Sequence, residues 1–197
     1  MSALLLATRN EHKLRELREA LPGVEIDPLP QEVELPPEEG ETFAENALGK
    51  ARAAHAATGR TAIADDSGIE AYGLAGRPGV RSARYAGEHA TDEENLAKLL
   101  EEVGAQQDRR VAYVCAIALA DEDGSESLFE GRCEGTLARE PRGSGGFGYD
   151  PAFLPDDTGP DDERTMAELA PAEKHAISHR GRAARKLAEH LGIEVPS

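Results

Sequence analysis

The feature that most constrains the fold is a pair of long segments separated by a tight turn. Residues 110–120 read RVAYVCAIALA, the strongest strand candidate in the chain, and residues 126–139 follow through an Asp123-Gly124 turn. A turn of this kind joins two antiparallel strands. Because this hairpin interrupts an alternation of short strands and helices, we expect an α/β fold with a mixed β-sheet.

Shorter segments on both sides of the hairpin predict the alternating elements. Strands are expected at residues 3–8, 24–29 and 61–66, and a glycine-rich loop is expected over residues 67–88. Helices are expected where a capping or proline residue precedes an apolar periodic segment. The predicted helices run from Asn10 to Leu21, from Thr42 to Thr58, from Thr91 to Val103 and from Pro171 to Leu191.

Length and composition limit the class of protein. The 197 residues suit one domain over residues 1–197, or two lobes that share one sheet. No apolar run approaches the roughly 20 residues of a membrane span, and the N-terminal segment lacks the features of a secretory signal. We therefore expect a cytoplasmic protein with no membrane partner. Cys115 and Cys133 lie in no CxxC motif and are expected to be small buried residues.

The charge balance argues against nucleic acid as a partner. Lys and Arg total 22 against 38 Asp and Glu, which gives a net charge of −16. A protein that binds nucleic acid needs a basic face, and a chain this acidic has little charge to build one.

The first candidate site is the polar turn Thr8-Arg9-Asn10-Glu11-His12-Lys13, between a predicted strand and a predicted helix. Free backbone N–H groups at a helix start attract anions, and Lys13 adds a positive charge. The turn is therefore a candidate phosphate site. The alternative is an ordinary helix N-cap with a solvated lysine, and this segment alone leaves both interpretations open.

The second candidate is Asp65-Asp66-Ser67-Gly68, which follows the apolar residues 61–64. Two carboxylates at the end of an apolar strand are unfavourable unless they meet a cation or water. Oxygen ligands in this position suit Mg²⁺, which usually also contacts substrate phosphates. The alternative is a turn with two exposed acids.

The third candidate is the segment GSGGFGYD, residues 143–150. Its four glycines let the backbone approach a ligand, and the rings of Phe147 and Tyr149 could stack on a planar base. The alternative is a flexible loop with two anchoring aromatic residues.

The fourth candidate is the segment from Lys174 to Lys186, which holds five Lys or Arg, two His and no acid. Such a local reversal of charge gives a polyanion a place to bind. The alternative is a helix with a cationic end. A zinc pair at His175 and His179 is disfavoured because the neighbouring cations would repel a metal. Taken together, the four segments indicate nucleoside triphosphate chemistry with Mg²⁺, without saying which bond is cut.

Five segments, in the same order along the chain, resemble the inosine triphosphate pyrophosphatase family. They are LLLATRNEHKLREL, EEGETFAENALGKA, AIADDSGIEAYGLAGRPGVRSARYAG, GFGYDPAFLP and EKHAISHRGRA. The resemblance implies an elongated mixed β-sheet flanked by helices, with two lobes and a central substrate cleft, and a homodimer. It also implies hydrolysis of non-standard purine nucleoside triphosphates (ITP, dITP and XTP) to the monophosphate and pyrophosphate, which cleanses the nucleotide pool.

The resemblance further implies a role for each motif residue. Asp66 would be the catalytic proton acceptor, and Glu38, Asp65 and Asp66 would hold Mg²⁺ as the cofactor. The separate roles of Asp65 and Asp66 stay open. The substrate would be bound by Thr8, Arg9, Asn10, Lys13, Ser67, Phe147, Gly148, Tyr149, Asp150, Lys174, His179 and Arg180.

Two other function classes stay open at this point. A nucleotide sensor that binds without turnover would be favoured if the acid pair were missing, but Asp65 and Asp66 are both present. A different Mg²⁺-dependent phosphohydrolase, such as a Nudix-type enzyme, would carry a REXXEEXGU pattern, which this sequence lacks.

Overall fold

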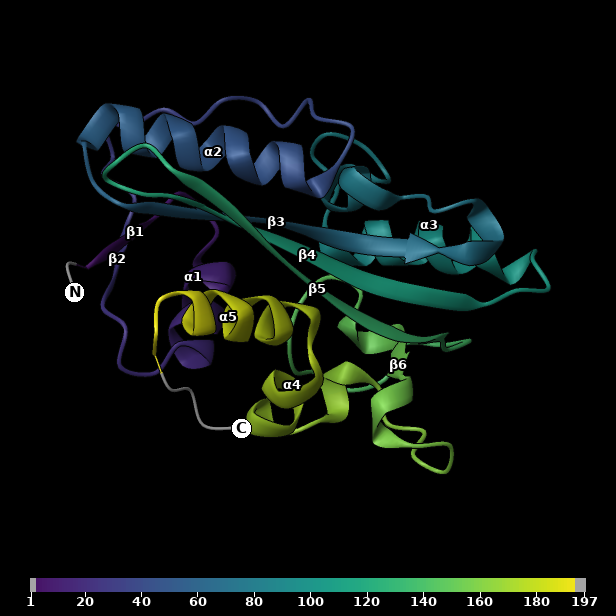
Figure 1. Cartoon of the computed structure of the whole chain (residues 1–197). Helices are drawn as coiled ribbons and strands as arrows, with labels where there is room; N and C mark the ends of the chain where they lie inside the picture. The colour runs from purple at the N-terminus through teal and green to yellow at the C-terminus, as the bar shows by residue number, and fades with distance from the viewer. Residues whose placement is uncertain (1–2, 194–197) are drawn as a thin grey trace. The chain divides into compact units, whose positions relative to one another are not determined.

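The computed structural model describes residues 3–193 and confirms the predicted α/β class (Figure 1). Six strands form one sheet in the order β2-β1-β3-β4-β5-β6. β1 pairs in parallel with β2 and β3, whereas β5 pairs antiparallel with β6, so the sheet is mixed as expected. The strands are β1 (Leu4–Leu6), β2 (Ile26–Pro28), β3 (Ala62–Ala71), β4 (Arg110–Ala120), β5 (Glu126–Leu137) and β6 (Phe153–Pro155).

The helices begin where the capping signals predict. Asn10, Thr42 and Thr91 are N-caps, and each of the two threonines completes a capping box with the glutamate three residues later. Such boxes satisfy backbone N–H groups that the helix itself leaves open. The helices are α1 (Glu11–Ala20), α2 (Phe43–Thr58), α3 (Asp92–Gly104), α4 (Pro171–Ile177) and α5 (His179–His190).

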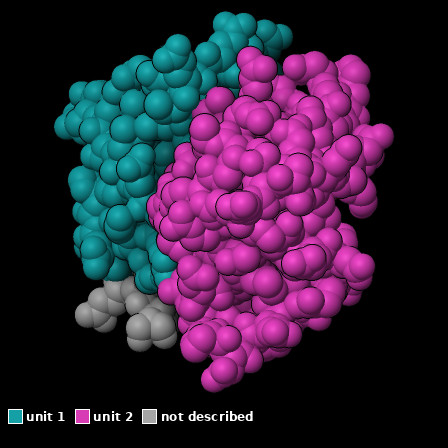
Figure 2. Space-filling model, turned by 90° about the vertical axis from the view of Figure 1, so that its right-hand side faces the viewer, with its two compact units in different colours: residues 1–66, 115–131, 179–197 teal, residues 67–114, 132–178 magenta. Residues whose placement is uncertain are grey.

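The chain separates into two compact units, drawn in different colours in Figure 2. Unit 1 comprises the chain up to Asp66, Cys115–Gly131 and the chain from His179 onward, and unit 2 comprises Ser67–Val114 and Arg132–Ser178. The chain therefore passes between the units within β3, β4 and β5, and again between α4 and α5. A single domain over residues 1–197 stays a prediction, and residues 1–2 and 194–197 lie outside the described part of the chain.

Unit 1 has an apolar core on each face of its part of the sheet. On one face, α1 and α5 pack against the strands through Leu17 and Leu187, together with Leu21 directly after α1. On the other, α2 buries the small side chains of Ala47 and Ala51, together with Ala54. Small side chains let a helix lie close to a sheet, and this brings the polar residues of the same helical face near β3.

Unit 2 has its own core, formed by α3, its parts of β3, β4 and β5, and the segment that ends in β6. Tyr113 of β4 and Phe153 of β6 are stacked at its centre, with their ring centroids 4.4 Å apart. Cys133 is buried in this core and Cys115 is buried in unit 1, and both are free thiols as expected.

Three elements differ from the sequence-based expectation, and one of them, the short strand β6, was not predicted. β3 continues to Ala71 instead of ending at Asp66, because Ile69 and Ala71 are buried in the core of unit 2. The glycine that suggested a loop, Gly68, lies within the strand, and any side chain there would overlap the Ser82 hydroxyl.

The final helix is also different, because it is two helices. The backbone of Ser178 is extended, with φ −65° and ψ 151°, and this ends α4 before α5 starts at His179. Serine favours helix ends over helix interiors because its hydroxyl competes for backbone hydrogen bonds. None of the helices formed by residues 3–193 combines the length and apolar character needed to cross a bilayer.

We predict that Gly131→Ala destabilises unit 1 by roughly 1–3 kcal/mol, the usual effect of overpacking. A Cβ at residue 131 of β5 would overlap the His179 carbonyl oxygen and lie 2.6 Å from the Ala183 nitrogen, both in the backbone of α5. Urea denaturation followed by circular dichroism measures the change. Gly104→Ala in α3 is the matched control, since its Cβ would meet no atom within 4 Å, and it should be neutral or stabilising.

Candidate functional site

The two adjacent aspartates of β3 accept hydrogen bonds and ion pairs from different side chains. Successive side chains of a strand point to opposite faces of its sheet. Asp65 is approached by Lys13 of α1 and Arg180 of α5, whereas Asp66 is approached by Asn46 and Lys50 of α2. The sequence left the separate roles of Asp65 and Asp66 open, and the structure shows the two carboxylates in different environments.

Asp65 is completely buried and lies at the centre of a network of ion pairs. Its Oδ2 atom is 3.2 Å from Lys13 Nζ, and it accepts hydrogen bonds from Arg180 Nε at 3.2 Å and Nη2 at 3.0 Å. The remaining Arg180 nitrogen, Nη1, donates to the Glu16 carboxylate. The other carboxylate oxygen, Asp65 Oδ1, is buried and accepts no hydrogen bond from any described residue.

Asp66 is also buried, but its partners differ in kind. Its Oδ2 atom accepts a hydrogen bond from the Asn46 side-chain amide at 2.9 Å, and its Oδ1 atom is 4.0 Å from Lys50 Nζ. Lys50 Nζ also lies 2.5 Å from Glu38 Oε1 and donates to the Asp65 carbonyl oxygen at 2.7 Å. The carboxylates of Glu38 and Asp66 therefore converge on a single ammonium group.

These environments move the pKa values of the two aspartates in opposite directions. Burial would raise the pKa of Asp65, but the positive charges of Lys13, Arg180 and Lys50 outweigh burial and hold it well below its ordinary value. Burial raises the pKa of Asp66 above its ordinary value, and Lys50 and Lys13 only partly offset this effect. Neighbouring acids whose pKa values are pushed apart are typical of a division between a fixed charge and a proton acceptor.

Lys50 and Glu38 belong to the same charged group as Asp65 and Asp66. Burial alone would lower the pKa of Lys50, but Asp65, Asp66 and Glu38 outweigh it and raise that pKa above its ordinary value. Burial would likewise raise the pKa of Glu38, and the charge of Lys50 outweighs it so that the pKa is lowered. The charges of Lys50 and Glu38 therefore stabilise each other.

The predicted phosphate turn is a capped helix start with a charged lysine beside it. The Asn10 side chain accepts from the His12 and Lys13 backbone nitrogens at 2.9 and 3.2 Å, and Thr8 Oγ1 accepts from the Asn10 nitrogen at 3.1 Å. The N-cap interpretation is thus confirmed. The solvated-lysine interpretation is wrong, because the Lys13 side chain is only 14% exposed and pairs with Asp65.

The Arg9 guanidinium binds the neighbouring loop. It donates to the carbonyl oxygens of Leu29 at 2.9 Å, Pro30 at 2.8 Å and Val33 at 2.7 Å, with a longer fourth contact to Gln31. These bonds occupy the side chain that the resemblance placed at the substrate. The geometry therefore indicates that Arg9 holds the loop over residues 29–33, and its contact with substrate stays a prediction.

In unit 2, the predicted base-binding residues gather around the buried carboxylate of Asp150. Its Oδ2 atom accepts from Lys174 Nζ at 2.8 Å and from the Phe147 backbone nitrogen at 3.0 Å, and its Oδ1 atom accepts from the Tyr113 hydroxyl at 3.1 Å. A Cβ at residue 146 would overlap Asp150 Oδ2. At least this glycine is therefore needed to let the loop wrap around Asp150.

The two aromatic rings of this loop differ in environment. Tyr149 is buried and its hydroxyl donates to the Ser82 carbonyl oxygen at 2.7 Å, which makes it an anchor of the loop. Phe147 is half-buried, and the Lys174 ammonium lies 5.5 Å from the centre of its ring. Gly148 donates its backbone N–H to Asp92 at 2.7 Å. Stacking on a base is therefore open to Phe147, whereas the ring of Tyr149 is covered by protein.

The cationic segment is divided between the two units. Lys174 lies in unit 2 beside Asp150, whereas His179 and Arg180 lie in unit 1 and are buried. Arg180 is held by Asp65 and Glu16, so the structure favours a role in organising unit 1 over direct contact with a base. Ser67 is half-buried at the first residue of unit 2.

Four residues that contact these groups were not predicted from the sequence: Glu16, Asn46, Lys50 and Tyr113. A usable signal existed for two of them. Asn46 and Lys50 occupy the same helical face as Ala47, Ala51 and Ala54, so a polar residue there points at the sheet. No local pattern marks Glu16 or Tyr113, because their partners are far away in the sequence.

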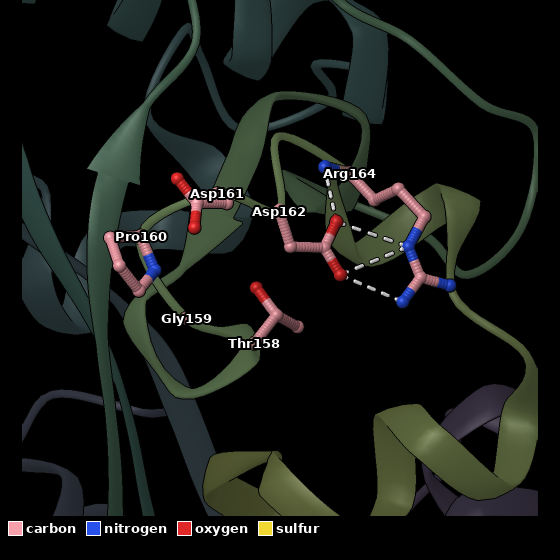
Figure 3. A pocket seen from close by; sticks show the side chains of 6 residues that line it. All are labelled: Thr158, Gly159, Pro160, Asp161, Asp162 and Arg164. Atoms are coloured by element: carbon pink, nitrogen blue, oxygen red, sulfur yellow. Dashed lines mark hydrogen bonds and ion pairs between the residues drawn. The ribbon is translucent and has the colours of Figure 1, made fainter.

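An open depression of about 450 Å³ lies elsewhere in unit 2, lined by Thr158 to Asp162 and Arg164 (Figure 3). Within it, Arg164 pairs with Asp162, and it also contacts Glu173. None of the predicted site residues lines this depression. We therefore do not assign it to the chemistry of Asp66 or Asp150.

Comparison with known proteins establishes the family. Residues 4–190 match the model of the Ham1 family, and the chain belongs to that family. It is 49% identical to the dITP/XTP pyrophosphatase of Mycolicibacterium paratuberculosis over 97% of this chain and 96% of the relative. It is 46% identical to the dITP/XTP pyrophosphatase of Geobacter sulfurreducens over 98% of both chains.

A solved structure supports the same conclusion. The HAM1 protein from Coxiella burnetii superposes with a TM-score of 0.86 at 45% sequence identity, covering 98% of this chain and 99% of that one. The fold class expected from the sequence is therefore that of a Ham1 protein.

We predict that Asp65→Asn and Asp66→Asn differ sharply in stability. Asp65→Asn leaves the buried Arg180 and the partly buried Lys13 without their shared carboxylate, and removal of one partner from a buried pair costs about 3–5 kcal/mol. Asp66→Asn should change the free energy of unfolding by less than about 1 kcal/mol, because the raised pKa of Asp66 means that folding already disfavours its charge. Urea denaturation at pH 7 measures the free energy of unfolding of both variants. Equal losses of stability would contradict the different environments of Asp65 and Asp66.

Proposed function

We propose that this Ham1-family protein hydrolyses non-standard purine nucleoside triphosphates (ITP, dITP and XTP) to the monophosphate and pyrophosphate. The observation that carries the proposal is the convergence of the Glu38 and Asp66 carboxylates on one cation, with Lys13 close by. The names of the relatives, which are dITP/XTP pyrophosphatases at 46–49% identity over nearly the whole chain, support the substrate class.

The oxygen atoms around Lys50 fit a bound Mg²⁺ ion. Within residues 3–193 no three His, Cys, Asp or Glu side chains form a ready-made metal cluster. Mg²⁺ does not require one, since it is commonly held by one or two carboxylates together with waters and substrate phosphates. Glu38 and Asp66 would hold it. The resemblance also implies Asp65 as a ligand, and its buried Oδ1 atom accepts no hydrogen bond from residues 3–193. When bound, the ion would draw charge from the phosphate oxygens and lower the pKa of a coordinated water.

The remaining chemistry comes from the side chains of the protein. Asp66 would accept the proton of the attacking water, because its carboxylate faces the Lys50 and Glu38 side of the site. Lys13 and Lys50 would offset the charge that builds up on the pyrophosphate as it leaves. Asp65 would stay ionised and hold Lys13 and Arg180 in place.

The Asp150 group of unit 2 would recognise the base. Lys174 is held by Asp150 and lies beside the Phe147 ring, so its ammonium can donate a hydrogen bond next to a surface on which a purine can stack. The 6-keto oxygen of hypoxanthine or xanthine is an acceptor that suits such a donor.

We also propose, on the resemblance of the five motif segments, that the protein acts as a homodimer in the cytoplasm and cleanses the nucleotide pool. Sedimentation at several concentrations tests the dimer directly, and a single species with the mass of one 21.0 kDa chain would contradict it.

We predict that the purified protein, in the presence of Mg²⁺, hydrolyses ITP with one water molecule to IMP and pyrophosphate. Separation of the products by anion-exchange chromatography distinguishes this outcome from IDP and phosphate, which would contradict the assigned bond. Asp66→Asn should lower kcat by at least 10²–10⁴-fold, the usual effect of losing a general base. A variant that keeps more than a tenth of the wild-type rate would overturn the role of Asp66.

We predict that kcat/KM is highest for ITP and XTP, lower for GTP and lowest for ATP. ATP carries a 6-amino donor that would face the Lys174 ammonium, and a site built on such a hydrogen bond can reject the wrong partner by roughly 10⁴-fold. GTP shares the 6-keto group and differs by its 2-amino group, so shape alone must exclude it, by roughly 10–200-fold. Competition assays at one Mg²⁺ concentration test the order, and hydrolysis of ATP as fast as ITP would refute the donor argument.

A further inference from the structure

The side chain of Asn46 has a fixed orientation between Asp66 and the loop that carries Glu38. Asn46 is 5% exposed, its Nδ2 atom donates to Asp66 Oδ2 at 2.9 Å, and its Oδ1 atom accepts from the Gly40 backbone nitrogen at 2.8 Å. A backbone N–H can only donate, so the oxygen of the amide must face Gly40. The amide NH₂ group must therefore face Asp66.

The loop on the other side of Asn46 is tied to the first turn of α2. The backbone nitrogen of Gly40 donates to Asn46, and those of Glu41 and Thr42 donate to the Glu45 carboxylate at 2.7 and 3.1 Å. A Cβ at residue 40 would lie 2.7 Å from Asn46 Oδ1 and 2.8 Å from the Glu45 Cβ, so this close approach requires glycine. Glu38 precedes this clamped segment by only two residues.

We propose that Asn46 is a positioning residue that aligns Asp66 with Glu38 for the hydrolysis proposed above, on which this inference rests. Its amide occupies Asp66 Oδ2, which leaves Oδ1 as the oxygen on the side of Lys50 and Glu38. Its carbonyl oxygen fixes the backbone that leads to Glu38. One side chain thus sets both the orientation of the proton acceptor and the position of the second carboxylate.

The chain contains a matched counterpart of this arrangement in unit 2. The pattern Thr-x-x-Glu-Asn occurs at Thr42 to Asn46 and again at Thr91 to Asn95, each time as a capping box followed by a buried asparagine. Asn95 Oδ1 accepts from the Ala86 nitrogen at 2.7 Å, and its Nδ2 donates to the Ala83 carbonyl oxygen at 3.1 Å. The two asparagines therefore differ in the group that meets the amide NH₂, which is a carboxylate for Asn46 and a backbone carbonyl for Asn95.

The experiment compares Asn46→Asp with Asn95→Asp in the full chain, with ITP and Mg²⁺. Each change keeps the shape and the bond to the loop nitrogen, and replaces the NH₂ donor by an oxygen. We expect Asn46→Asp to lower kcat by roughly 10–100-fold, the effect of losing a hydrogen bond to a charged group, with KM changed less than about threefold. Asn95→Asp should lose about as much thermal stability as Asn46→Asp, but its kcat should stay within about threefold of the wild-type value. Asn46→Ser, a smaller uncharged residue, should also lower kcat.

A second measurement does not depend on activity. In ¹H–¹⁵N spectra of the nucleotide-free protein, the side-chain NH₂ signal of Asn46 should move when Asp66 is changed to Asn, and that of Asn95 should stay in place. The positioning role alone would be overturned if the wild type is active and Asn46→Asp has the same kcat as Asn95→Asp. The same conclusion would follow if Asn46→Asp raises KM and leaves kcat unchanged. A wild type that releases no pyrophosphate from ITP would overturn the proposed hydrolysis together with the positioning role.

Discussion

The arrangement of unit 1 depends on one buried negative charge. The carboxylate of Asp65 pairs with Lys13 from α1 and Arg180 from α5, two helices that are far apart in the sequence and pack on the same face of the sheet. A buried carboxylate is unfavourable without such partners, and the same is true of the arginine. Glu16 binds the last guanidinium nitrogen, so the network joins α1, α5 and β3.

This network has a consequence for the neighbouring residue. The pleat of β3 directs Asp66 toward α2. Lys13 and Arg180, which keep Asp65 ionised, therefore stabilise the charge of Asp66 less. Burial therefore raises the pKa of Asp66, while charge pairing lowers that of Asp65. Two residues of the same type, adjacent in sequence, become a fixed charge and a proton acceptor because of the helices that approach them.

Local chemistry made much of the fold predictable. The capping boxes at Thr42 and Thr91 gave the starts of two helices, and the Asp123-Gly124 turn gave two neighbouring strands, because these signals act within a few residues. The extent of β3 was not predictable in this way. Gly68 resembles a loop residue in sequence, and only the approach of Ser82 shows why a glycine lies within the strand.

The candidate site was predictable by residue type and less so by role. Asp66, Lys13, Asp150 and Lys174 stand in recognisable motifs, and the structure places them in charged or hydrogen-bonded groups. The motif could not show that Arg180 faces Asp65, or that Arg9 binds the carbonyl oxygens of a loop, since both contacts connect distant segments. Asn46 and Lys50 were missed because polar residues on an alanine-rich helix are usually exposed.

The central claim, that Asp65 is the fixed charge and Asp66 the proton acceptor, is tested most directly by a ¹³C NMR titration of the side-chain carboxyl groups in the metal-free protein. The pKa of an unperturbed aspartate is about 3.9. The account predicts that the Asp66 signal titrates above this value, and that the Asp65 signal is unchanged until the pH lies well below it. Titration of both groups near the ordinary value, or of Asp65 above Asp66, would contradict it.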